Sequence, residues 1–561
     1  MKMYRTITQT IYLLFFVAAT FFTPTAHAQK KSKKKAKEAA AREQLLDSRL
    51  RQHVTILAHD SLEGRRTGTE GEQKAVKYII GNYRQLGISG GNGPDYQQSF
   101  EVFEGLDYRK TSAVSINGQA LKPGTDFIPF AWSAEGAVES ETVVALNEGG
   151  EAWWIDADNI VEANKENPHF VLGTKLFEVA KDAAAKGARA VIFYKGGLDS
   201  EKFPKYLPRD RGNALSIPVW MVKQDALTRL NITDQAETRI SAKIALQEVK
   251  RAGTNVVAMI NNNAPLTIAI GAHLDHLGYG EDENSRYTGE AAIHNGADDN
   301  ASGTAAVLEL ARLLKEKGDK RFNFLFLHFS GEELGLFGSK YFTEHPTLDL
   351  KKVDYMINLD MVGRLNDSSK ALTIGGIGTS PMWPALVQPT ADFTLKIDSS
   401  GTGPSDHTSF YRKDIPVLFF FTGLHTDYHK PSDDANLINY GGIARIVHFI
   451  EGIIEKSPAD APLAFTKTRE QSMGTRGFKV SIGIMPDYTF SGTGVKADGL
   501  VDGRPAQKAG MLPNDVILQL GDYLITGMDT YMQALNRFEK GQTTTIVVKR
   551  DKEVLHLSIT F

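Results

Sequence analysis

LTIAIGAHLDHLG, at residues 266–278, decides the fold that we expect for this chain. It sets a short apolar run directly before three polar groups, His273, Asp275 and His276. Short apolar runs bounded by loops are typical of strands buried in a mostly parallel sheet. In open sheets of this kind, ligands bind beyond the carboxyl ends of the strands. The segment therefore predicts a buried strand with a functional site at its end.

Similar apolar runs recur on both sides of this segment and alternate with helical patterns. The runs that we interpret as strands lie at residues 255–260, 266–270, 322–329, 355–359 and 417–421, and the helices between or after them include residues 303–316 and 442–455. Pro416 stands directly before the last run, a position where a strand tolerates proline. The alternation predicts an α/β domain with helices on both faces of a mostly parallel sheet.

The chain is too long for one hydrophobic core, since its 561 residues exceed the roughly 100–200 residues of a typical domain. From about residue 110 to 250 the pattern changes to short strands with turns, which predicts a β-rich unit between two parts of the α/β domain. The α/β domain would then consist of residues 48–124 and 251–456. Residues 457–470 are rich in Pro, Ala, Lys and Thr, which is typical of a linker, and residues 471–561 form a separate small unit.

The N-terminal 28 residues have the features of a secretory signal peptide. Basic residues precede an apolar stretch at 11–22, and Ala-His-Ala at 26–28 matches the pattern of a cleavage site. The stretch is shorter than the roughly 20 residues that span a bilayer, so we expect cleavage after residues 1–28 rather than an anchor. Residues 29–47 form a lysine-rich leader that we expect to be disordered before it enters a helix, with contact to an anionic surface as the alternative. We expect a periplasmic or extracellular protein without an integral membrane segment.

The composition of the chain restricts the chemistry that it can carry out. There is no cysteine, which excludes disulfides, thiolate zinc sites, iron–sulfur clusters and cysteine nucleophiles. Any transition-metal site must therefore use His, Asp and Glu. Lys and Arg number 64 against 67 Asp and Glu, so no basic excess indicates a nucleic-acid partner.

Acids and histidines recur at or just after the ends of the predicted strands. The segments are GAHLDHLG, HNGADDNASG, FSGEELGLFGS, NLDMVGR and TDYHKPSDD, all within residues 271–434. Hydrolysis of an amide at neutral pH needs an activated water and stabilisation of the oxyanion, and a pair of divalent metals provides both. His and carboxylates are ordinary zinc ligands, and a further, unligated carboxylate is needed as general base. The five segments together therefore favour a two-metal hydrolytic site.

These segments also resemble a known family. HLD, GADDNASG, EELGLFGS, LDM and YHKPSDD, in this order, are similar to the motifs of the co-catalytic zinc aminopeptidases of metallopeptidase family twenty-eight. The resemblance covers about residues 48–110 and 250–455. It implies two Zn²⁺ ions per chain, held by five side chains: His273, Asp298, Glu333, Asp360 and His429. Asp298 would bridge the ions. His273 and Asp360 would complete one site, and the remaining two side chains would complete the other.

The resemblance implies roles for two acids beside these ligands. Glu332 would be the general base. Asp275 would accept a hydrogen bond from His273 and so fix the tautomer and orientation of the imidazole, as is usual for a ligating histidine. The peptide bond between Asp298 and Asp299 is often cis in this family.

The segment GPSDHTSF, at residues 403–410, is also found in many relatives. Ser405, Asp406 and His407 suggest a serine-hydrolase triad, but consecutive side chains in an extended segment do not converge. The GxSxG motif of such hydrolases does not accompany them. We expect His407 to line the substrate side of the site, with a purely structural role in the loop as the alternative.

Two further resemblances concern the other predicted units. Residues 125–250 resemble a protease-associated domain, mainly through AAAKGARAVIFYKGG and IPVWMV, which implies a lid or a substrate-selecting wall; a spacer is the alternative. Residues 471–561 resemble a bacterial protease PDZ domain, mainly through DGRPAQKAGMLPNDVILQLGD. Its groove would lie at Ile482, Gly483 and Ile484 and would bind peptide C-termini beside a sheet edge. A packing module with a blocked groove is the alternative.

The sequence as a whole predicts a secreted metallo-aminopeptidase that removes N-terminal residues from peptides. Glutaminyl cyclase-like activity on the same fold is an alternative, although such cyclases usually work with one zinc ion. Carboxypeptidase activity is another, although no arginine can be assigned to a substrate carboxylate. A non-catalytic peptide-binding protein is the third, and the intact set of ligands together with Glu332 argues against it.

Overall fold

A computed structural model of the chain describes residues 23–165, 172–195, 215–282, 284–468, 480–486, 490, 492–500, 503–535 and 537–561. Residues 1–22, which hold most of the predicted signal peptide, lie outside the described residues, as do residues 471–479 of the predicted PDZ domain. No described helix combines the length and the hydropathy that crossing a membrane requires.

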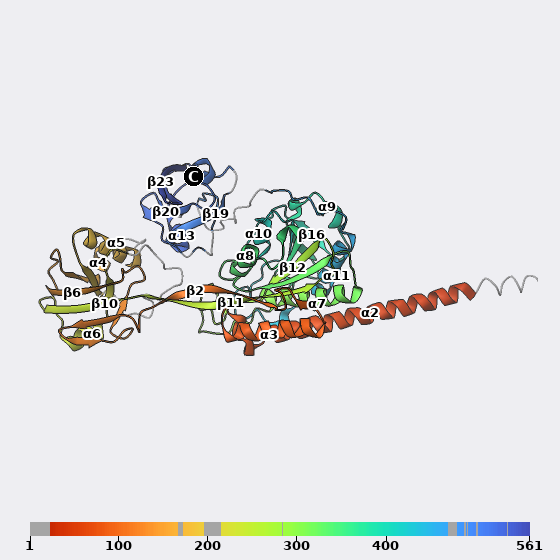
Figure 1. Cartoon of the computed structure of the whole chain (residues 1–561), viewed down its shortest axis with the longest axis horizontal. Helices are drawn as coiled ribbons and strands as arrows, with labels where there is room; N and C mark the ends of the chain where they lie inside the picture. Colours follow the sequence, from red (N-terminus) through yellow and green to blue (C-terminus); the bar gives the residue numbers. More distant parts are fainter. Residues whose placement is uncertain are drawn as a thin grey trace, which may run out of the picture.

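The central domain is a nine-stranded sheet with helices on both faces (Figure 1). Its strands are β1 Ser89–Gly90, β2 Gln97–Asp107, β11 Gln247–Ile260, β12 Thr267–His273, β13 Asn323–Phe329, β14 Val353–Leu359, β15 Ala371–Gly375, β16 Thr394–Ile397 and β17 Val417–Phe421. They follow the order β1-β11-β13-β12-β14-β17-β15-β16, and β2 pairs with β11. Neighbours β13, β12, β14 and β17 are parallel, so the predicted α/β fold is confirmed.

Two layers of helices cover this sheet. On one face lie α2 Thr23–Leu57, α3 Glu70–Gln85, α7 Gly303–Lys317 and α11 Tyr440–Lys456, and on the other α8 Phe337–Glu344 and α10 His407–Tyr411. Successive side chains of a strand point to opposite faces, so Ile268 and Ile270 join the first core while Ala269 joins the second. Both faces of β12 are therefore buried, which explains its continuous apolar sequence.

The lysine-rich leader is helical, which differs from the expected disorder of residues 29–47. Helix α2 begins at Thr23 and continues without a break to Leu57. Its many Ala, Lys, Glu and Arg residues have high intrinsic helix propensity. Leu46, Leu50 and Val54 are buried at helical spacing against the domain, whereas the N-terminal part projects away from it (Figure 1).

The inserted domain lies at the far end of a two-stranded ribbon made by β2 and β11 (Figure 1). It contains two four-stranded sheets, β4-β3-β10-β6 and β5-β9-β8-β7, and is β-rich as predicted. Its elements are β3 Ala113–Ile116, β4 Gln119–Leu121, β5 Phe127–Pro129, β6 Gly136–Val143, β7 Ala152–Asp156, α4 Ala157–Ala163, α5 Leu172–Ala185, β8 Ala190–Tyr194, β9 Val219–Val222, α6 Gln224–Leu230 and β10 Glu237–Ile244. The predicted boundary at residue 125 falls inside this unit, because β3 and β4 precede it in the chain and are joined to β10 in one sheet.

The C-terminal domain is a small, mainly antiparallel unit with its own hydrophobic core. Its elements are β18 Ile484–Pro486, β19 Val495–Leu500, α12 Pro505–Lys508, β20 Val516–Leu520, β21 Tyr523–Leu524, α13 Met528–Leu535, β22 Thr543–Arg550 and β23 Glu553–Thr560. Ile482 is buried, and Gly483 has a φ of 80°, a conformation in which any other residue would be strained. Ile484 then opens β18, which pairs with β19.

Candidate metal centre

The carboxyl ends of the parallel strands carry the polar groups that the sequence places there. His273 is the last residue of β12, and Asp360 directly follows β14. Glu332 and Glu333 lie in the loop after β13. His429 lies in the loop after β17. Because parallel strands end at one edge of the sheet, these loops from distant parts of the chain converge.

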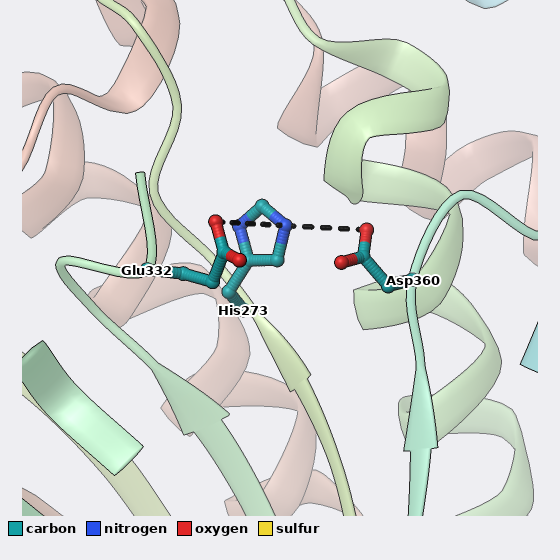
Figure 2. Close-up of side chains that lie close together, drawn as sticks. All are labelled: His273, Glu332 and Asp360. Atoms are coloured by element: carbon teal, nitrogen blue, oxygen red, sulfur yellow. Dashed lines mark hydrogen bonds and ion pairs between the residues drawn. The ribbon is translucent and has the colours of Figure 1, made fainter. Parts of the chain in front are cut away.

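His273 is the centre of a first group of donors. Its imidazole lies between the carboxyl groups of Glu332 and Asp360 (Figure 2). One donor atom from each of the three residues lies within 4.8 Å of the others, an arrangement that can hold a metal ion. Nε2 of His273 is 3.3 Å from Oδ1 of Asp360 and 3.9 Å from Oε2 of Glu332.

A second group of donors lies beside the first. It consists of His276, Asp299 and Glu333. One donor atom from each of them also lies within 4.8 Å of the others, so this group can hold an ion as well. His429 belongs to this group, since its Nε2 is 3.2 Å from Oε2 of Glu333 and 3.3 Å from Oδ2 of Asp299. Nδ1 of His276 is 2.7 Å from Oε1 of Glu333, which is the length of an ordinary charge-assisted hydrogen bond.

Asp299 joins the two groups. Its Oδ1 is 3.2 Å from Nε2 of His273, and its Oδ2 is 3.3 Å from Nε2 of His429. One carboxylate thus faces both histidines with different oxygens. This is the arrangement expected of a carboxylate that bridges two metal ions.

The assignment of Asp298 as the bridging ligand is therefore wrong by one residue. Both aspartates lie in the turn Ala297–Ser302, which precedes α7. Oδ1 of Asp298 accepts hydrogen bonds from the Gly363 N–H at 2.6 Å and from the Ser302 hydroxyl at 3.0 Å, so this carboxylate is directed away from the centre. Consecutive side chains in the turn point to different sides, and the side chain of Asp299 points toward His273 and His429. The cis peptide bond is likewise found one residue later than expected, between Asp299 and Asn300.

The spacing of the donor atoms fits zinc. Ligand atoms at the usual zinc bond lengths of about 2.0–2.2 Å lie about 3.3–3.6 Å apart when the ion is tetrahedral. The contacts of His273 with Asp299 and Asp360, and those of His429 with its two carboxylates, measure 3.2–3.3 Å. Direct charge-assisted hydrogen bonds are shorter, at about 2.7–2.9 Å. The donor set and its spacing therefore fit two metal ions that share Asp299.

Electrostatics supports the same conclusion. Burial alone would lower the pKa of His429, but Glu333 and Asp299 outweigh it and raise this pKa to about 11. His273 is affected in the same way, since Asp360 and Glu332 raise its pKa well above the ordinary value against the effect of burial. Buried carboxylates thus leave an excess of negative charge that the histidines and the buried Arg65 must offset. Cations bound at this position would remove that excess.

Two backbone carbonyl groups orient the histidines. Nδ1 of His273 donates to the carbonyl oxygen of Asp275 at 3.1 Å, while the Asp275 carboxylate is slightly farther away, at 3.7 Å. Nδ1 of His429 donates to the carbonyl oxygen of Asn284 at 2.8 Å. In the neutral form of each ring, which is the form that binds metal, Nε2 is then free of hydrogen and faces the acids. The sequence gives no sign of the contribution of Asn284, because a backbone carbonyl has no residue signature.

Ser405 and His407 have separate places and do not form a triad. The Ser405 hydroxyl donates to Oδ2 of Asp360 at 2.7 Å and so fixes a candidate ligand. His407 stacks on Phe419 with ring centroids 4.5 Å apart. Burial lowers the pKa of His407 to about 3, so its imidazole is uncharged at neutral pH.

A cavity of about 250 Å³ opens onto the acids. Its lining includes the acids Asp299, Glu332 and Glu333 and the rings of His407, Phe419 and Phe421. His407 thus lies in the wall of this cavity. The lining combines carboxylates with aromatic rings.

Sequence comparison relates the chain to known peptidases. Residues 255–454 match the profile of peptidase family M28, and residues 481–561 match that of the PDZ domain. Aminopeptidase YwaD of Bacillus subtilis is 29% identical over 274 residues, which cover 47% of this chain and 56% of that protein. Leupeptin-inactivating enzyme 1 of Streptomyces exfoliatus is 30% identical over 199 residues, which cover 34% of this chain and 40% of that protein. The chain thus spans about half the length of these relatives.

Solved structures of aminopeptidases are also similar to this chain. The zinc aminopeptidase BSAP from Bacillus subtilis is 21% identical with a TM-score of 0.41, over 74% of this chain and 97% of that one. The aminopeptidase from Aneurinibacillus sp. strain AM-1 is 20% identical with a TM-score of 0.38. The match covers 76% of this chain and 96% of that one. The chain is thus similar to peptidase family M28 over residues 255–454 and to the PDZ domain over residues 481–561.

Proposed function

We propose that the protein is a two-zinc aminopeptidase that removes residues from the free N-termini of peptides. The observation that carries the proposal is the position of Asp299, whose two oxygens face His273 and His429 at the spacing of zinc ligands. The M28 profile match supports it, as do the names of the relatives, several of which are aminopeptidases.

The donors divide into two ligand sets. His273, Asp360 and one oxygen of Asp299 would hold one ion. His429, Glu333 and the other oxygen of Asp299 would hold the second. When bound, such a pair lowers the pKa of water and polarises the scissile carbonyl group.

Glu332 is suited to transfer the proton of the attacking water. It is directed into the cavity beside His273, and its own contacts with the ligands are longer than theirs with one another. Burial, together with Asp360 and Glu333, raises the pKa of Glu332 well above its ordinary value despite the opposing effect of His273. A carboxylate of raised pKa holds a proton more firmly, so Oε2 can take one from the attacking water and return it to the leaving amine.

The cavity favours a peptide N-terminus over a C-terminus. The carboxylates of Asp299, Glu332 and Glu333 in its lining suit the positive charge of a free α-amine. The rings of Phe419 and Phe421 suit the side chain of the first residue, and His407 would line that subsite. No lysine or arginine stands among the described residues that line the cavity, which argues against the capture of a substrate carboxylate by a carboxypeptidase.

The other units would support this activity. We propose that residues 1–28 direct secretion to the periplasm or beyond the cell, and that the inserted domain is a protease-associated domain that acts as a wall or lid for substrates. The groove of the PDZ domain at Ile482–Ile484 would bind the C-termini of peptides by adding a strand beside β18.

The first prediction distinguishes the two neighbouring aspartates. Asp299→Asn should bind at most one zinc ion tightly, because an amide cannot bridge two cations as a carboxylate does. Asp298→Asn, the matched control, should retain two, since its side chain is directed toward Gly363. Metal content after dialysis against buffered zinc gives the measurement. Equal loss in both variants, or loss only in Asp298→Asn, would return the bridging role to Asp298.

The second prediction concerns Glu332. Glu332→Gln keeps the size of the side chain but removes the proton acceptor, so kcat should fall by about 10²–10⁴ while both metals remain bound. Peptide turnover and metal content are measured on the same sample. Glu344→Gln, at an exposed acid on the far end of α8, should behave as the unmodified protein. Full activity of Glu332→Gln would show that another group moves the proton.

The third prediction concerns the direction of cleavage. Peptides with a free N-terminus should lose residues one at a time from that end, because a free amine matches the carboxylates that line the cavity. Their N-acetylated counterparts should be cut poorly. Mass spectrometry of timed digests identifies the products. Release from the C-terminus, cyclisation of N-terminal glutamine without cleavage, or equal cleavage of blocked peptides would each contradict the proposal.

A further inference from the structure

A buried carboxylate outside the ligand set, Asp282, lies in the loop at residues 279–294, which the structure describes except for residue 283. Its side chain is only 8% exposed. It is held by two arginines from different parts of the chain, Arg66 and Arg251. A charge buried in this way is stable only when it is well paired.

Both arginines bind both oxygens of the Asp282 carboxylate. Arg66 uses two of its nitrogens, and Arg251 uses one. Arg66 donates from Nε to Oδ2 at 2.8 Å and from its terminal nitrogen to Oδ1 at 2.9 Å. Arg251 donates to both oxygens, at 3.0 and 3.1 Å. These guanidinium groups outweigh the effect of burial and hold the pKa of Asp282 below its ordinary value. The carboxylate is therefore charged and tightly fixed.

The two arginines anchor the loop to rigid parts of the domain. Arg251 lies in β11, where the ribbon to the inserted domain pairs it with Val102 of β2. The backbone of Arg66 forms an isolated parallel β-bridge with His276, directly beside the metal centre. Asp282 thus fixes its loop between the base of the ribbon and the loop that follows β12.

The same loop contacts two of the three ligands of the second site, His429 and Glu333, beginning two residues later at Asn284. The carbonyl oxygen of Asn284 accepts from Nδ1 of His429 at 2.8 Å, and its side-chain amide donates to the carbonyl oxygen of Glu333 at 3.2 Å. The Arg286 N–H donates to the carbonyl oxygen of His429 at 2.9 Å. The orientation of His429 therefore depends on where this loop lies.

We infer that Asp282 is a positioning residue for the second metal site, the one formed by His429, Glu333 and Asp299. The inference rests on the proposed two-metal centre. Its physical reason is that loss of the carboxylate removes the acceptor that Arg66 and the buried Arg251 share, and leaves them the longer contacts with Glu104, at 3.3 and 4.0 Å. The loop must then shift, and the carbonyl of Asn284 moves away from the imidazole. A ligating histidine without its outer hydrogen bond binds metal less well.

The first site has no such dependence. His273 is oriented by the carbonyl oxygen of Asp275, and Asp360 by the Ser405 hydroxyl, and neither lies in the 279–294 loop. Loss of Asp282 should therefore weaken one metal site selectively rather than both. This selectivity separates a positioning role from a general contribution to stability.

The test is a zinc titration of the full-length protein against a competing chelator. Asp282→Asn should bind one zinc ion with unchanged affinity and the second about 10–100-fold more weakly. The visible spectrum of the cobalt(II)-loaded variant should change for the second ion bound, since the geometry at His429 is altered. Asp282→Glu, which keeps the charge, should recover much of the affinity. Asp515→Asn removes a comparable buried partner of Arg550 in the PDZ domain and should bind both ions normally.

The outcomes are distinguishable. If Asp282→Asn does not fold, as judged by circular dichroism, then Arg251→Gln replaces it, because Arg66 still pairs with the carboxylate. Unchanged affinity at both sites in the folded variant, or equal weakening of both, overturns the positioning role of Asp282. If the unmodified protein binds fewer than two zinc ions, the two-metal centre itself is wrong, and the role of Asp282 is rejected with it.

Discussion

The carboxylate of Asp299, buried between His273 and His429, is the constraint on which the rest of the site depends. Buried carboxylates repel one another, and without cations the only compensation comes from neighbouring histidines and arginines. The raised pKa of both histidines reflects this demand. A pair of metal ions meets it directly, which is why the arrangement indicates a metal centre rather than an ordinary ion-pair network.

The fold holds this concentrated charge in place through backbone groups. The parallel strands deliver His273 and Asp360 to one edge of the sheet. Asp433 accepts the backbone N–H groups of Asp298 and Asp299 at 2.9 and 3.0 Å, and so holds the turn that presents the bridging carboxylate. Arg65, fully buried, donates to the carbonyl oxygens of Leu274 and Gly296 and joins the loops that carry the ligands. The ligands are thus positioned by partners that are themselves fixed.

The sequence predicted the strands well because a strand buried on both faces leaves a continuous apolar run, as in Asn323–Phe329. It also predicted which segments converge, since parallel strands end at one edge. It did not distinguish Asp298 from Asp299, because the local turn, and not the residue type, decides which carboxylate faces inward. The carbonyl of Asn284 left no signal, because a backbone carbonyl has no residue signature. The leader was expected to be disordered from its lysines, although its alanine-rich continuation favours a helix.

The most direct measurement of the central claim is a crystal structure of the zinc-loaded protein with anomalous data at the zinc edge. The account predicts two anomalous peaks about 3.5–4 Å apart. One should lie between His273 and Asp360, the other between His429 and Glu333, with one oxygen of Asp299 bonded to each. A single peak, or two peaks that Asp299 does not bridge, would contradict it.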